Sequence, residues 1–474
     1  MARPRLSLLS ASDKELVHEQ TVRVLEEVGV GFNSARAIAI LEAAGAPVDH
    51  HRLTARIPRE LLERCLATAP RRVVMAARDP ARDIVLDDGA PLACCADGEG
   101  CLVMDDATGD VREATLQDVR DALRLYDALP EIDFLWTSLS TRELDQALAP
   151  LALDAIALRE SSKHLQSVSP KAPAAVPALL DMLEAVAGAT LAERPIYSLI
   201  VCTIAPLQHD PEATDACLEL CRHGVSLCVM PVAQMGSTSP MSVLGTTVIT
   251  MAELLSAVVL YQLAAPGCAV IHGPLPGASD MRSGLYVGGA PEVGIVNLAC
   301  VEMSRFYGMP VIGSGSTTDA KGVDFQAAAE DTLLWLSVAA AGADGLVATS
   351  FIDGSQILSP AKTVLDADAL GMLKRFLRET EISEATALFD DIAEVGIGGH
   401  YLAQKSTSRF ARAGELWQPA VFRRGTFAAH RRTTLLQDAA ARARELLAHH
   451  EVLPLPDEVE RRIDAAIAEY ARTL

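Results

Sequence analysis

Residues able to carry acid–base chemistry concentrate in short polar segments, each placed after an apolar run. Residues 272–282 contain a histidine, an aspartate and an arginine, and residues 313–321 end in Asp319 and Lys321 after a Gly-Ser-Gly-Ser-Thr sequence. Similar polar segments occur at three other places, residues 97–100, 230–238 and 349–354. Histidine, carboxylate and lysine side chains can exchange protons with a bound substrate. We therefore predict that His272, Asp319 and Lys321 are catalytic.

Each of these residues also has a different interpretation. Asp319 could cap the helix that follows it, and His272 could be a hydrogen-bonded core residue at the end of a strand. The backbone amides of the glycine-rich run could hold a phosphate, although its spacing matches neither the dinucleotide fingerprint nor the phosphate loop. Lys321 could form a Schiff base or act as a general base, as in an aldolase or isomerase. The convergence of several such segments favours a functional site.

Short apolar or β-branched runs alternate with amphipathic stretches from residue 92 onward, a pattern typical of parallel sheets built from β-α-β units. We predict eight strands, at residues 92–97 (with a return through 102–105), 134–138, 164–169, 197–203, 226–230, 269–272, 311–314 and 346–350. We predict seven helices between them, at residues 115–128, 145–160, 174–187, 211–222, 241–264, 291–306 and 325–342. Eight strands can close around a filled interior. The predicted fold is therefore an α/β TIM (β/α)8 barrel, in which chemistry lies on the loops that follow the strands.

Helical segments flank the predicted barrel on both sides. Near the N-terminus, Ser12-Asp-Lys-Glu15 has the spacing of a capping box before an amphipathic run. We predict an N-terminal helical cap over residues 1–90, the barrel over 91–355, and a C-terminal helical extension packed on the barrel over 356–474.

The composition excludes several classes of partner. With 41 basic and 62 acidic residues among 474, the net charge is −21, and such a surface repels nucleic acid and anionic membranes. Residues 254–271 are apolar but interrupted by Pro266 and Gly267, which predicts a buried helix, a turn and a strand rather than a membrane span. The N-terminal apolar run is too short for a signal peptide, and the ten cysteines contain no Cys-x-x-Cys. We expect a cytoplasmic protein without a metal of its own.

Several segments resemble one known family over nearly the full length of the chain. They are Leu25-Glu-Glu-Val-Gly29-Val, Ala77-Arg-Asp-Pro80, Ala114-Thr-Leu-Gln-Asp-Val119, Asp280-Met-Arg282, Phe306-Tyr-Gly-Met-Pro310, Thr318-Asp-Ala-Lys321 with Asp324 and Gln326, and Val395-Gly-Ile-Gly-Gly-His400. In order and spacing, the chain is similar to the trimethylamine and glycine betaine methyltransferases, which transfer a methyl group to a corrinoid protein.

This resemblance implies a barrel that presents the methyl group of a small amine to cob(I)alamin carried by a separate corrinoid protein. A cobalamin-carrying module usually contains Asp-x-His-x-x-Gly, whereas the nearest match here begins at Asp49 and has Thr54 in place of the glycine. The cofactor is therefore expected on a partner. We also expect a homo-oligomer.

The chain departs from the family at two places. Members that act on trimethylamine carry pyrrolysine inside the barrel, near the stretch equivalent to residues 313–318, and every residue here is standard. After His400 the family often continues with further histidines, where this chain has Gln404-Lys405-Ser406. These departures bear on the substrate more than on the reaction.

A quaternary ammonium suits a site without pyrrolysine or zinc, because its leaving group is already a neutral amine. We therefore predict a quaternary, betaine-like or otherwise methylated amine as substrate. Carboxylates and aromatic rings can hold the cation, and Arg282 can bind a carboxylate through two parallel hydrogen bonds. The predicted substrate-binding residues are Arg282, Asp353, Glu99, Gln234, Tyr286, Phe351, His400 and Tyr401, with Trp136 as a further ring candidate. The alternatives are an aldolase or isomerase that uses Lys321, and a non-catalytic betaine-binding protein.

Overall fold

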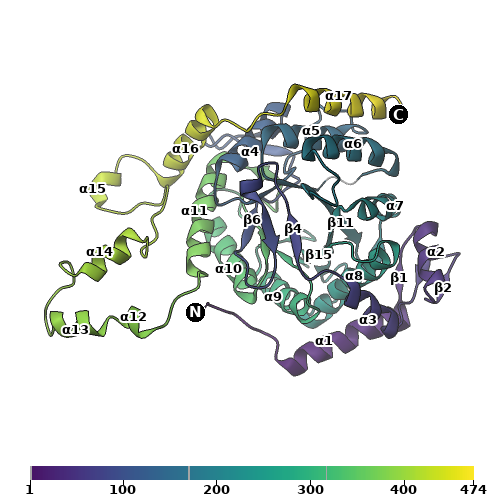
Figure 1. The fold of residues 1–474 in the computed structure, drawn as a ribbon, viewed down its shortest axis with the longest axis horizontal. Helices are drawn as coiled ribbons and strands as arrows, with labels where there is room; N and C mark the ends of the chain where they lie inside the picture. The colour runs from purple at the N-terminus through teal and green to yellow at the C-terminus, as the bar shows by residue number, and fades with distance from the viewer. Residues whose placement is uncertain (1–2, 169–170, 316–317) are drawn as a thin grey trace.

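The computed structural model describes residues 3–168, 171–315 and 318–474. Eight parallel strands form its centre, and we refer to them together as the strand core. They are β6 (Ala93–Cys95), β9 (Phe134–Trp136), β10 (His164–Ser167), β11 (Tyr197–Ile204), β13 (Ser226–Met230), β15 (Val270–His272), β18 (Ile312–Ser314) and β19 (Gly345–Val347). Each overlaps a strand predicted from the sequence, although Ser169, at the end of the third predicted strand, lies outside the described residues. Figure 1 shows the major helices arranged in a ring around these strands.

The strands pair in two parallel runs. One run has the order β9-β10-β11-β13-β15, and the other has the order β18-β19-β6. A single parallel bridge between His272 and Val311 joins the end of the first run to the second. At the opposite junction, the amide of Asp133 donates to the carbonyl of Cys94 at 2.7 Å. Hydrogen bonds therefore join the described strands into two runs in contact, not into one closed sheet.

A helix follows each strand of the core and covers it from outside. These helices are α4 (Leu116–Ala128), α5 (Ala149–Glu160), α6 (Val176–Ala187), α7 (Pro211–Leu220), α8 (Val243–Ala264), α9 (Pro291–Phe306), α10 (Phe325–Ala341) and α11 (Pro360–Phe376). Their starts follow from the sequence: Thr115 and Asp118 form a capping box at α4, and the Asp324 side chain accepts from two amides at α10.

Helix α8 is long and apolar enough to cross a membrane, but 78% of its most apolar stretch is buried inside the protein. It ends at Ala264, and β15 begins at Val270 after a turn. This is the helix, turn and strand predicted for residues 254–271.

The period of two along each strand places one set of side chains inside the core. Cys95, Phe134, Trp136, Ile200 and Met230 form one buried cluster there. The same cluster includes Val73, Met75 and Leu86 from the hairpin of β4 (Val73–Met75) and β5 (Ile84–Leu86). The hairpin therefore covers the amino-terminal ends of the strands, which we call the amino-end face. The opposite side, where the strands end and the predicted site loops begin, is the carboxyl-end face.

The N-terminal ninety residues are less uniformly helical than the sequence pattern predicts. Helices α1 (Ala11–Arg23), α2 (Ala35–Ala43) and α3 (Arg59–Thr68) pack against α8. Between and after them lie the short strands β1 (Val30–Gly31), β2 (Val48–Asp49) and β3 (Thr54–Ala55), and the β4–β5 hairpin. Two- and three-residue strands are too short to produce a readable alternation in sequence. Ser10, not Ser12, caps α1, in a box with Asp13.

The C-terminal segment is divided between packed and projecting parts. Helix α16 (Leu435–His449) packs on α11 and α4, and α17 (Asp457–Ala471) packs on α6 and α5. The short helices α12 (Glu384–Ala387), α13 (Phe389–Val395), α14 (Lys405–Arg412) and α15 (Phe427–His430) instead project from the body, at the left of Figure 1. The predicted extension therefore packs on the strand core only in part.

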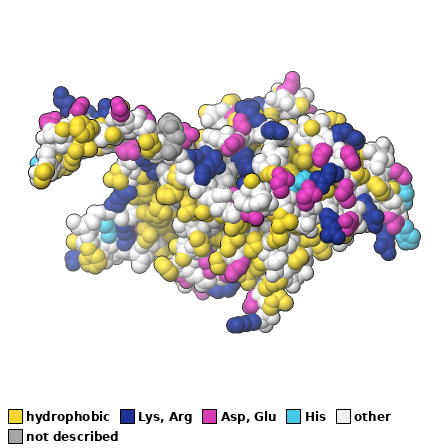
Figure 2. Space-filling view, turned by 90° about the horizontal axis from the view of Figure 1, so that it is seen from below, with side chains coloured by type: hydrophobic (Ala, Val, Ile, Leu, Met, Phe, Trp, Pro, Cys, Tyr) yellow, Lys and Arg dark blue, Asp and Glu magenta, His cyan; other side chains and the backbone are white. Residues whose placement is uncertain are grey.

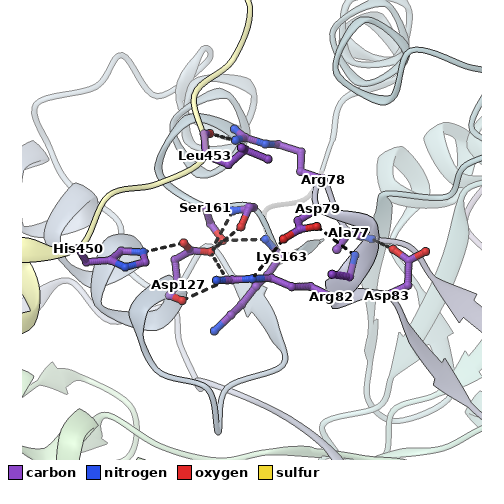
Figure 3. Close-up of polar contacts among 12 residues, drawn as sticks. Ala77, Arg78, Asp79, Arg82, Asp83, Asp127, Ser161, Lys163, His450 and Leu453 are labelled. Atoms are coloured by element: carbon purple, nitrogen blue, oxygen red, sulfur yellow. Dashed lines mark hydrogen bonds and ion pairs between the residues drawn. The ribbon is translucent and has the colours of Figure 1, made fainter.

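A polar network at the amino-end face ties the C-terminal tail to the core. Figure 3 shows side chains converging on the buried Asp127. Its carboxylate accepts from Arg82 at 2.8 Å, from the Ser161 hydroxyl at 2.8 Å and from His450 of the tail at 2.7 Å. Burial alone would raise the pKa of Asp127, but these donors and the Ser162 amide lower it.

Candidate functional site at the carboxyl-end face

The loop after β19 holds an unusual concentration of strained backbone. Thr349, Ser350, Asp353 and Ser355 have φ angles of 125°, 80°, 55° and 65°. Non-glycine residues seldom adopt this left-handed region, and each such residue costs about 1–3 kcal/mol unless the surroundings impose it. Clusters of strained residues mark functional sites more often than ordinary loops do. The strain therefore points to the loop predicted from sequence at residues 349–354.

Buried charges impose this strained conformation. The amide of Ser350 donates to Asp366 on α11 at 2.8 Å. The Lys362 ammonium, also on α11, donates to Asp366 at 2.6 Å and to Asp331 on α10 at 2.7 Å. Burial opposes the charge on Lys362, but the two carboxylates outweigh it and raise the pKa of Lys362, while burial raises the pKa of Asp331 to about 7.

The same loop reaches the end of β6. Asp97, which follows that strand, is 5% exposed and accepts a hydrogen bond from the Ser355 hydroxyl. Burial raises the pKa of Asp97 to about 6. Phe351 lies buried against Gly100, where a Cβ would come within 2.5 Å of the Phe351 ring. Gly100, in the polar segment 97–100, is therefore required because a larger residue would clash with Phe351 in the segment 349–354.

Asp319 links two of the predicted site loops. Its carboxylate accepts from the amides of Gly288 and Gly289 at 3.0 Å each, just before α9. Glu330 on α10 in turn accepts from the Asp319 amide at 2.9 Å and from the Thr318 hydroxyl at 2.5 Å. Burial raises the pKa of Asp319 despite the two amides. Asp319 therefore caps no helix of its own, because Asp324 occupies that position at α10.

Other predicted residues join neighbouring loops at this face. Lys321 forms an ion pair with Asp353, so the loops after β18 and β19 are joined by their side chains. The ring of Tyr286, which is 36% exposed, lies over Gly277 and beside Gly354. Gln234 accepts from the Ser279 hydroxyl at 3.1 Å, which connects the loops after β13 and β15.

Two further groups at this face were missed from sequence. Cys202 lies on the inner side of β11, as Ile200 does. It is exposed near the carboxyl end of that strand. Burial of the thiol on its protein side raises the pKa of Cys202 to about 12, and the Glu99 carboxylate adds to this. In sequence, Cys202 is indistinguishable from a core thiol.

Glu99 is exposed at the end of β6, although the protein atoms packed around its carboxylate raise its pKa by desolvation. Among the described residues, none donates a hydrogen bond to its carboxylate. The nearest opposing charge is Lys171, whose ammonium is buried and lies 3.0 Å from Asp154. No sequence signal marks the Lys171–Asp154 pair, because the two residues lie on different elements.

Four predicted residues lie apart from this group. His272 points outward to α9, where its Nδ1 lies 3.0 Å from the Ser304 hydroxyl, and burial lowers its pKa to about 3. Arg282 is exposed at the tip of the loop after β15. His400 and Tyr401 are exposed in the projecting segment between α13 and α14. Strand alternation explains His272: Ile271 occupies the inward position, so the next residue faces the helices.

The assembled site offers carboxylates, the exposed Lys321 and the partly exposed Tyr286 around the mouth of the strand core. Within the described ranges, no three His, Cys, Asp or Glu side chains gather to hold a metal ion. Asp97 is buried and Glu99 is exposed near it, and both carboxylates have raised pKa values, a perturbation that is common at functional sites. The arrangement therefore suits recognition of a small organic cation.

Comparison with known proteins decides the family. The family model described as trimethylamine methyltransferase matches residues 1–474. The chain belongs to this family. It is 28% identical to the trimethylamine methyltransferase MttB of Desulfitobacterium hafniense, over 98% of this chain and 94% of the relative. It is 26% identical to a glycine betaine methyltransferase of Desulfitobacterium hafniense, over 99% of this chain and 98% of the relative.

The solved structures agree on the fold. The crystal structure of the Methanosarcina barkeri monomethylamine methyltransferase MtmB is similar to this chain, with a TM-score of 0.57 and 12% identity, over 99% of this chain and 88% of the other. The family resemblance expected from sequence is thus confirmed. The protein is a methyl-transferring enzyme of the methylamine and betaine methyltransferase family, with a mixed α/β fold.

Proposed function

We propose that this protein transfers a methyl group from a quaternary, betaine-like amine to the cob(I)alamin of a separate corrinoid protein. The observation that carries the proposal is the full-length family match in a chain built only of standard residues. The exposed carboxylate of Glu99 and the buried carboxylate of Asp97, both of which follow β6, support a cationic substrate.

The chemistry explains why few catalytic groups are needed. In the transfer, the bond between nitrogen and the methyl carbon breaks, both electrons stay on nitrogen, and a neutral tertiary amine leaves. No proton moves, so no general acid is required. The corrinoid supplies the nucleophile that accepts the methyl group. The residues of this chain orient the substrate and keep water away from the methyl carbon.

Individual residues are assigned to these tasks as follows. Glu99 faces the cationic end of the amine, and the Tyr286 ring adds cation–π stabilisation. Asp319 positions the loop before α9, and the Lys321–Asp353 pair holds the neighbouring loop. Arg282 lies apart from the other site residues in the structure, and we propose that it binds the carboxylate of a betaine from the exposed tip of the loop after β15.

A corrinoid protein is a bulky methyl acceptor, so it needs an open path from solvent to the substrate. Cys202 is exposed on the inner side of β11, so the carboxyl-end face is open to the inner side of the core. A partner-held corrinoid can approach the substrate only from that direction, because the β4–β5 hairpin covers the other end.

We further propose that the eight strands act as one (β/α)8 barrel. The His272–Val311 bridge and the Asp133–Cys94 hydrogen bond span the two gaps between the parallel runs. A continuous barrel places all eight strand ends around one mouth. It also accounts for the contacts between the first and last polar segments.

The test uses the whole protein with chemically reduced free cob(I)alamin as methyl acceptor. Glycine betaine, trimethylamine and tetramethylammonium are each supplied, and loss of Co(I) absorbance is followed together with the demethylated amine by NMR. We expect betaine to turn over and trimethylamine to be inert. Betaine binding with no turnover, even when a corrinoid protein is added, would make the protein a binder. Borohydride trapping of a carbonyl substrate on Lys321 would make it an aldolase.

The Arg282 assignment has its own test. Because the guanidinium is exposed, we expect Arg282→Ala to weaken betaine binding about tenfold by calorimetry. Binding of tetramethylammonium, which has no carboxylate, should not change. Equal loss for both ligands would show that Arg282 does not recognise the carboxylate.

A further inference from the structure

A cavity of about 380 Å³ lies between α10 and α11, on the outside of the strand core. The residues that line it come from these two helices, from the start of α16 and from the short segments beside them. Most of them are apolar, among them Trp335, Met372 and Leu436. Figure 1 shows α10 and α11 as neighbours in the ring of outer helices. A cavity of this size and lining suits a small organic ligand.

Two buried carboxylates form the polar end of the cavity. Asp331 and Asp366 both line it and are 4% and 7% exposed. The Oδ2 atom of each accepts from the Lys362 ammonium, at 2.7 Å and 2.6 Å, and Oδ2 of Asp366 also accepts from the Ser350 amide. The Oδ1 atom of each accepts no hydrogen bond from any residue that the structure describes. Buried polar atoms are seldom left without a partner, so both oxygens indicate a donor that comes from a ligand.

The charges around the cavity favour a cation as that donor. Lys362 is the one basic residue among the described residues that line it, and its ammonium already donates to Asp331 and Asp366. Asp324 adds a third carboxylate. A bound anion would therefore be repelled, and an alcohol would bring a donor without charge. A protonated amine brings both, and hydrogen bonds between ionised groups are stronger than neutral ones.

The opposite end of the cavity is apolar and reaches the surface. Ala328 and Met372, which line it, are exposed, and Phe325, one turn before Ala328 on α10, is 88% exposed. Figure 2 shows hydrophobic side chains gathered over the underside of the molecule, where α9 and α10 lie in Figure 1. An alkyl chain is stabilised by burial against such walls, so the ligand needs an apolar body as well as an ammonium group.

We propose that the cavity between α10 and α11 is a second ligand site, which binds a protonated primary amine with an alkyl chain. The ammonium donates to Oδ1 of Asp331 and Oδ1 of Asp366, and the alkyl chain lies among Trp335, Met372 and Leu436. The site is distinct from the carboxyl-end face. The substrate proposed for that face is a quaternary ammonium, which has no N–H group to donate.

The second site is linked to the strained loop after β19. Asp366 accepts from the amide of Ser350 at 2.8 Å, and Ser350 has a φ of 80°. Further along the same loop, Ser355 donates to Asp97 at the end of β6. A ligand that orders Asp366 reduces the motion of the groups that hold this loop. Occupancy of the cavity should therefore stabilise the strained conformation of residues 349–355.

The test is calorimetric titration of the full-length protein with n-hexylammonium. We expect one equivalent to bind in the cavity with a Kd below about 1 mM. Hexyltrimethylammonium keeps the charge but has no N–H group, and 1-hexanol has a donor but no charge. Each should bind the cavity about tenfold more weakly or worse. Hexanoate, which is an anion, should not bind there.

Two phenylalanine variants on adjacent residues identify the cavity as the place of binding. Ala328→Phe fills the cavity from an exposed position, whereas Ala329→Phe puts the same ring on an exposed residue that does not line it. We expect Ala328→Phe to weaken hexylammonium binding by about tenfold or more, and Ala329→Phe to stay within about twofold of wild type. Equal binding by the two variants, no binding by wild type, or equal affinity for hexanol would overturn the proposal.

Hydrogen exchange measures the link to the loop without any need for methyl transfer. With hexylammonium bound, the amides of residues 349–355 should exchange about threefold more slowly or better in wild type and in Ala329→Phe. The same ligand should leave exchange in Ala328→Phe unchanged. If these amides exchange at the same rate in saturated and ligand-free wild type, the proposed link between the cavity and the loop is wrong.

Discussion

At the amino-end face of the strand core, Asp127 is surrounded by donors, whereas at the carboxyl-end face Glu99 stands without one among the described residues. Asp127 accepts from Arg82, Ser161 and His450, and its pKa is lowered as a result. Desolvation by the surrounding protein atoms instead raises the pKa of Glu99. Removing the acceptor from a buried charge network is strongly destabilising, whereas the exposed Glu99 receives no hydrogen bond from a described residue and is available to a ligand.

The backbone shows the same contrast. The carboxyl-end face holds the strained residues Thr349, Ser350 and Asp353 in one loop, and the Lys362 network on α10 and α11 keeps them in place. At the amino-end face, the β4–β5 hairpin fills the end of the core with apolar side chains. In folds with parallel strands and outer helices, this separation places chemistry at one end and stability at the other.

Removing the carboxylate of Asp127, which accepts several hydrogen bonds, should have the largest effect on stability. In the Asp127→Ala variant, Arg82, His450 and two serine donors lose their acceptor while they stay buried or half-buried. We expect the free energy of unfolding to fall by about 3–5 kcal/mol, because breaking a buried charge network leaves uncompensated groups. Methyl transfer by the folded protein should be unchanged. Chemical denaturation and turnover at a permissive temperature measure the two effects.

The matched control is Asp181→Ala, which removes an exposed ion pair with Arg462 from the same C-terminal tail. It should cost less than about 1 kcal/mol. If both variants are equally stable, the Asp127 network does not anchor the tail. If Asp127→Ala loses turnover at full stability, the division between the two faces is wrong.

Removing the carboxylate of Glu99 should instead weaken ligand binding and leave stability nearly unchanged. Glu99→Gln takes away an exposed carboxylate that has no donor of its own among the described residues, so stability should stay nearly unchanged. We expect binding of a quaternary ammonium to weaken by about 10- to 100-fold, the range for loss of a charged partner. Calorimetric titration with glycine betaine measures it.

Glu113→Gln is the control for net charge. Glu113 lies on β8 (Val111–Glu113), whose partner β7 (Leu102–Met104) follows the Glu99 loop, and its side chain is 63% exposed. It should leave betaine affinity within about twofold of wild type. Equal weakening by both variants would mean that the overall field of the face, and not Glu99, attracts the cation.

Asp97 should make the stability of the folded protein depend on pH. Burial raises its pKa to about 6, from 3.8 in the unfolded chain. Between these values the folded protein holds a proton that the unfolded chain has lost, so stability falls as pH rises through this window. We expect Asp97→Asn to be more stable than wild type, with an advantage that grows by about 1 kcal/mol between pH 5 and pH 7.5. Urea unfolding at both values tests it, and an advantage that shrinks with pH would contradict it.

The strands were predictable because each is an apolar run bounded by polar loops. All eight lie where periodicity placed them, and the family was recognisable from segments such as Thr318-Asp-Ala-Lys321. The short strands β1 to β5 were not predicted, since two or three residues cannot show a period. The projection of α12 to α15 from the body was not predicted either: these short helices have the composition of a packed extension, and only the three-dimensional arrangement shows that their apolar residues lack cover.

The site was predictable to the level of loops but not of roles. Asp319, Lys321 and Asp353 do lie together, because parallel strand ends converge. The position of His272 at a strand end predicts a place in the site, but a shift of one residue along a strand reverses the direction of the side chain. Glu330 and the Lys362 network lie on helices, where carboxylates in a sequence are indistinguishable from solvated ones.

The smallest stability effect is expected at the ion pair that joins the last two loops. Lys321 is paired with Asp353, with side chains 74% and 37% exposed, and exposed pairs of this kind contribute less than about 1 kcal/mol. Lys321→Ala should therefore leave the thermal midpoint nearly unchanged. Turnover should still fall several-fold, because Asp353 lies in the strained loop and loses its partner in the neighbouring one. A Schiff-base lysine would behave differently, since its removal abolishes activity outright and such lysines are desolvated or lie beside another cation. Lys321→Arg separates these outcomes: it keeps the ion pair and should restore most of the turnover if Lys321 positions the loop, whereas an arginine cannot form the Schiff base of an aldolase.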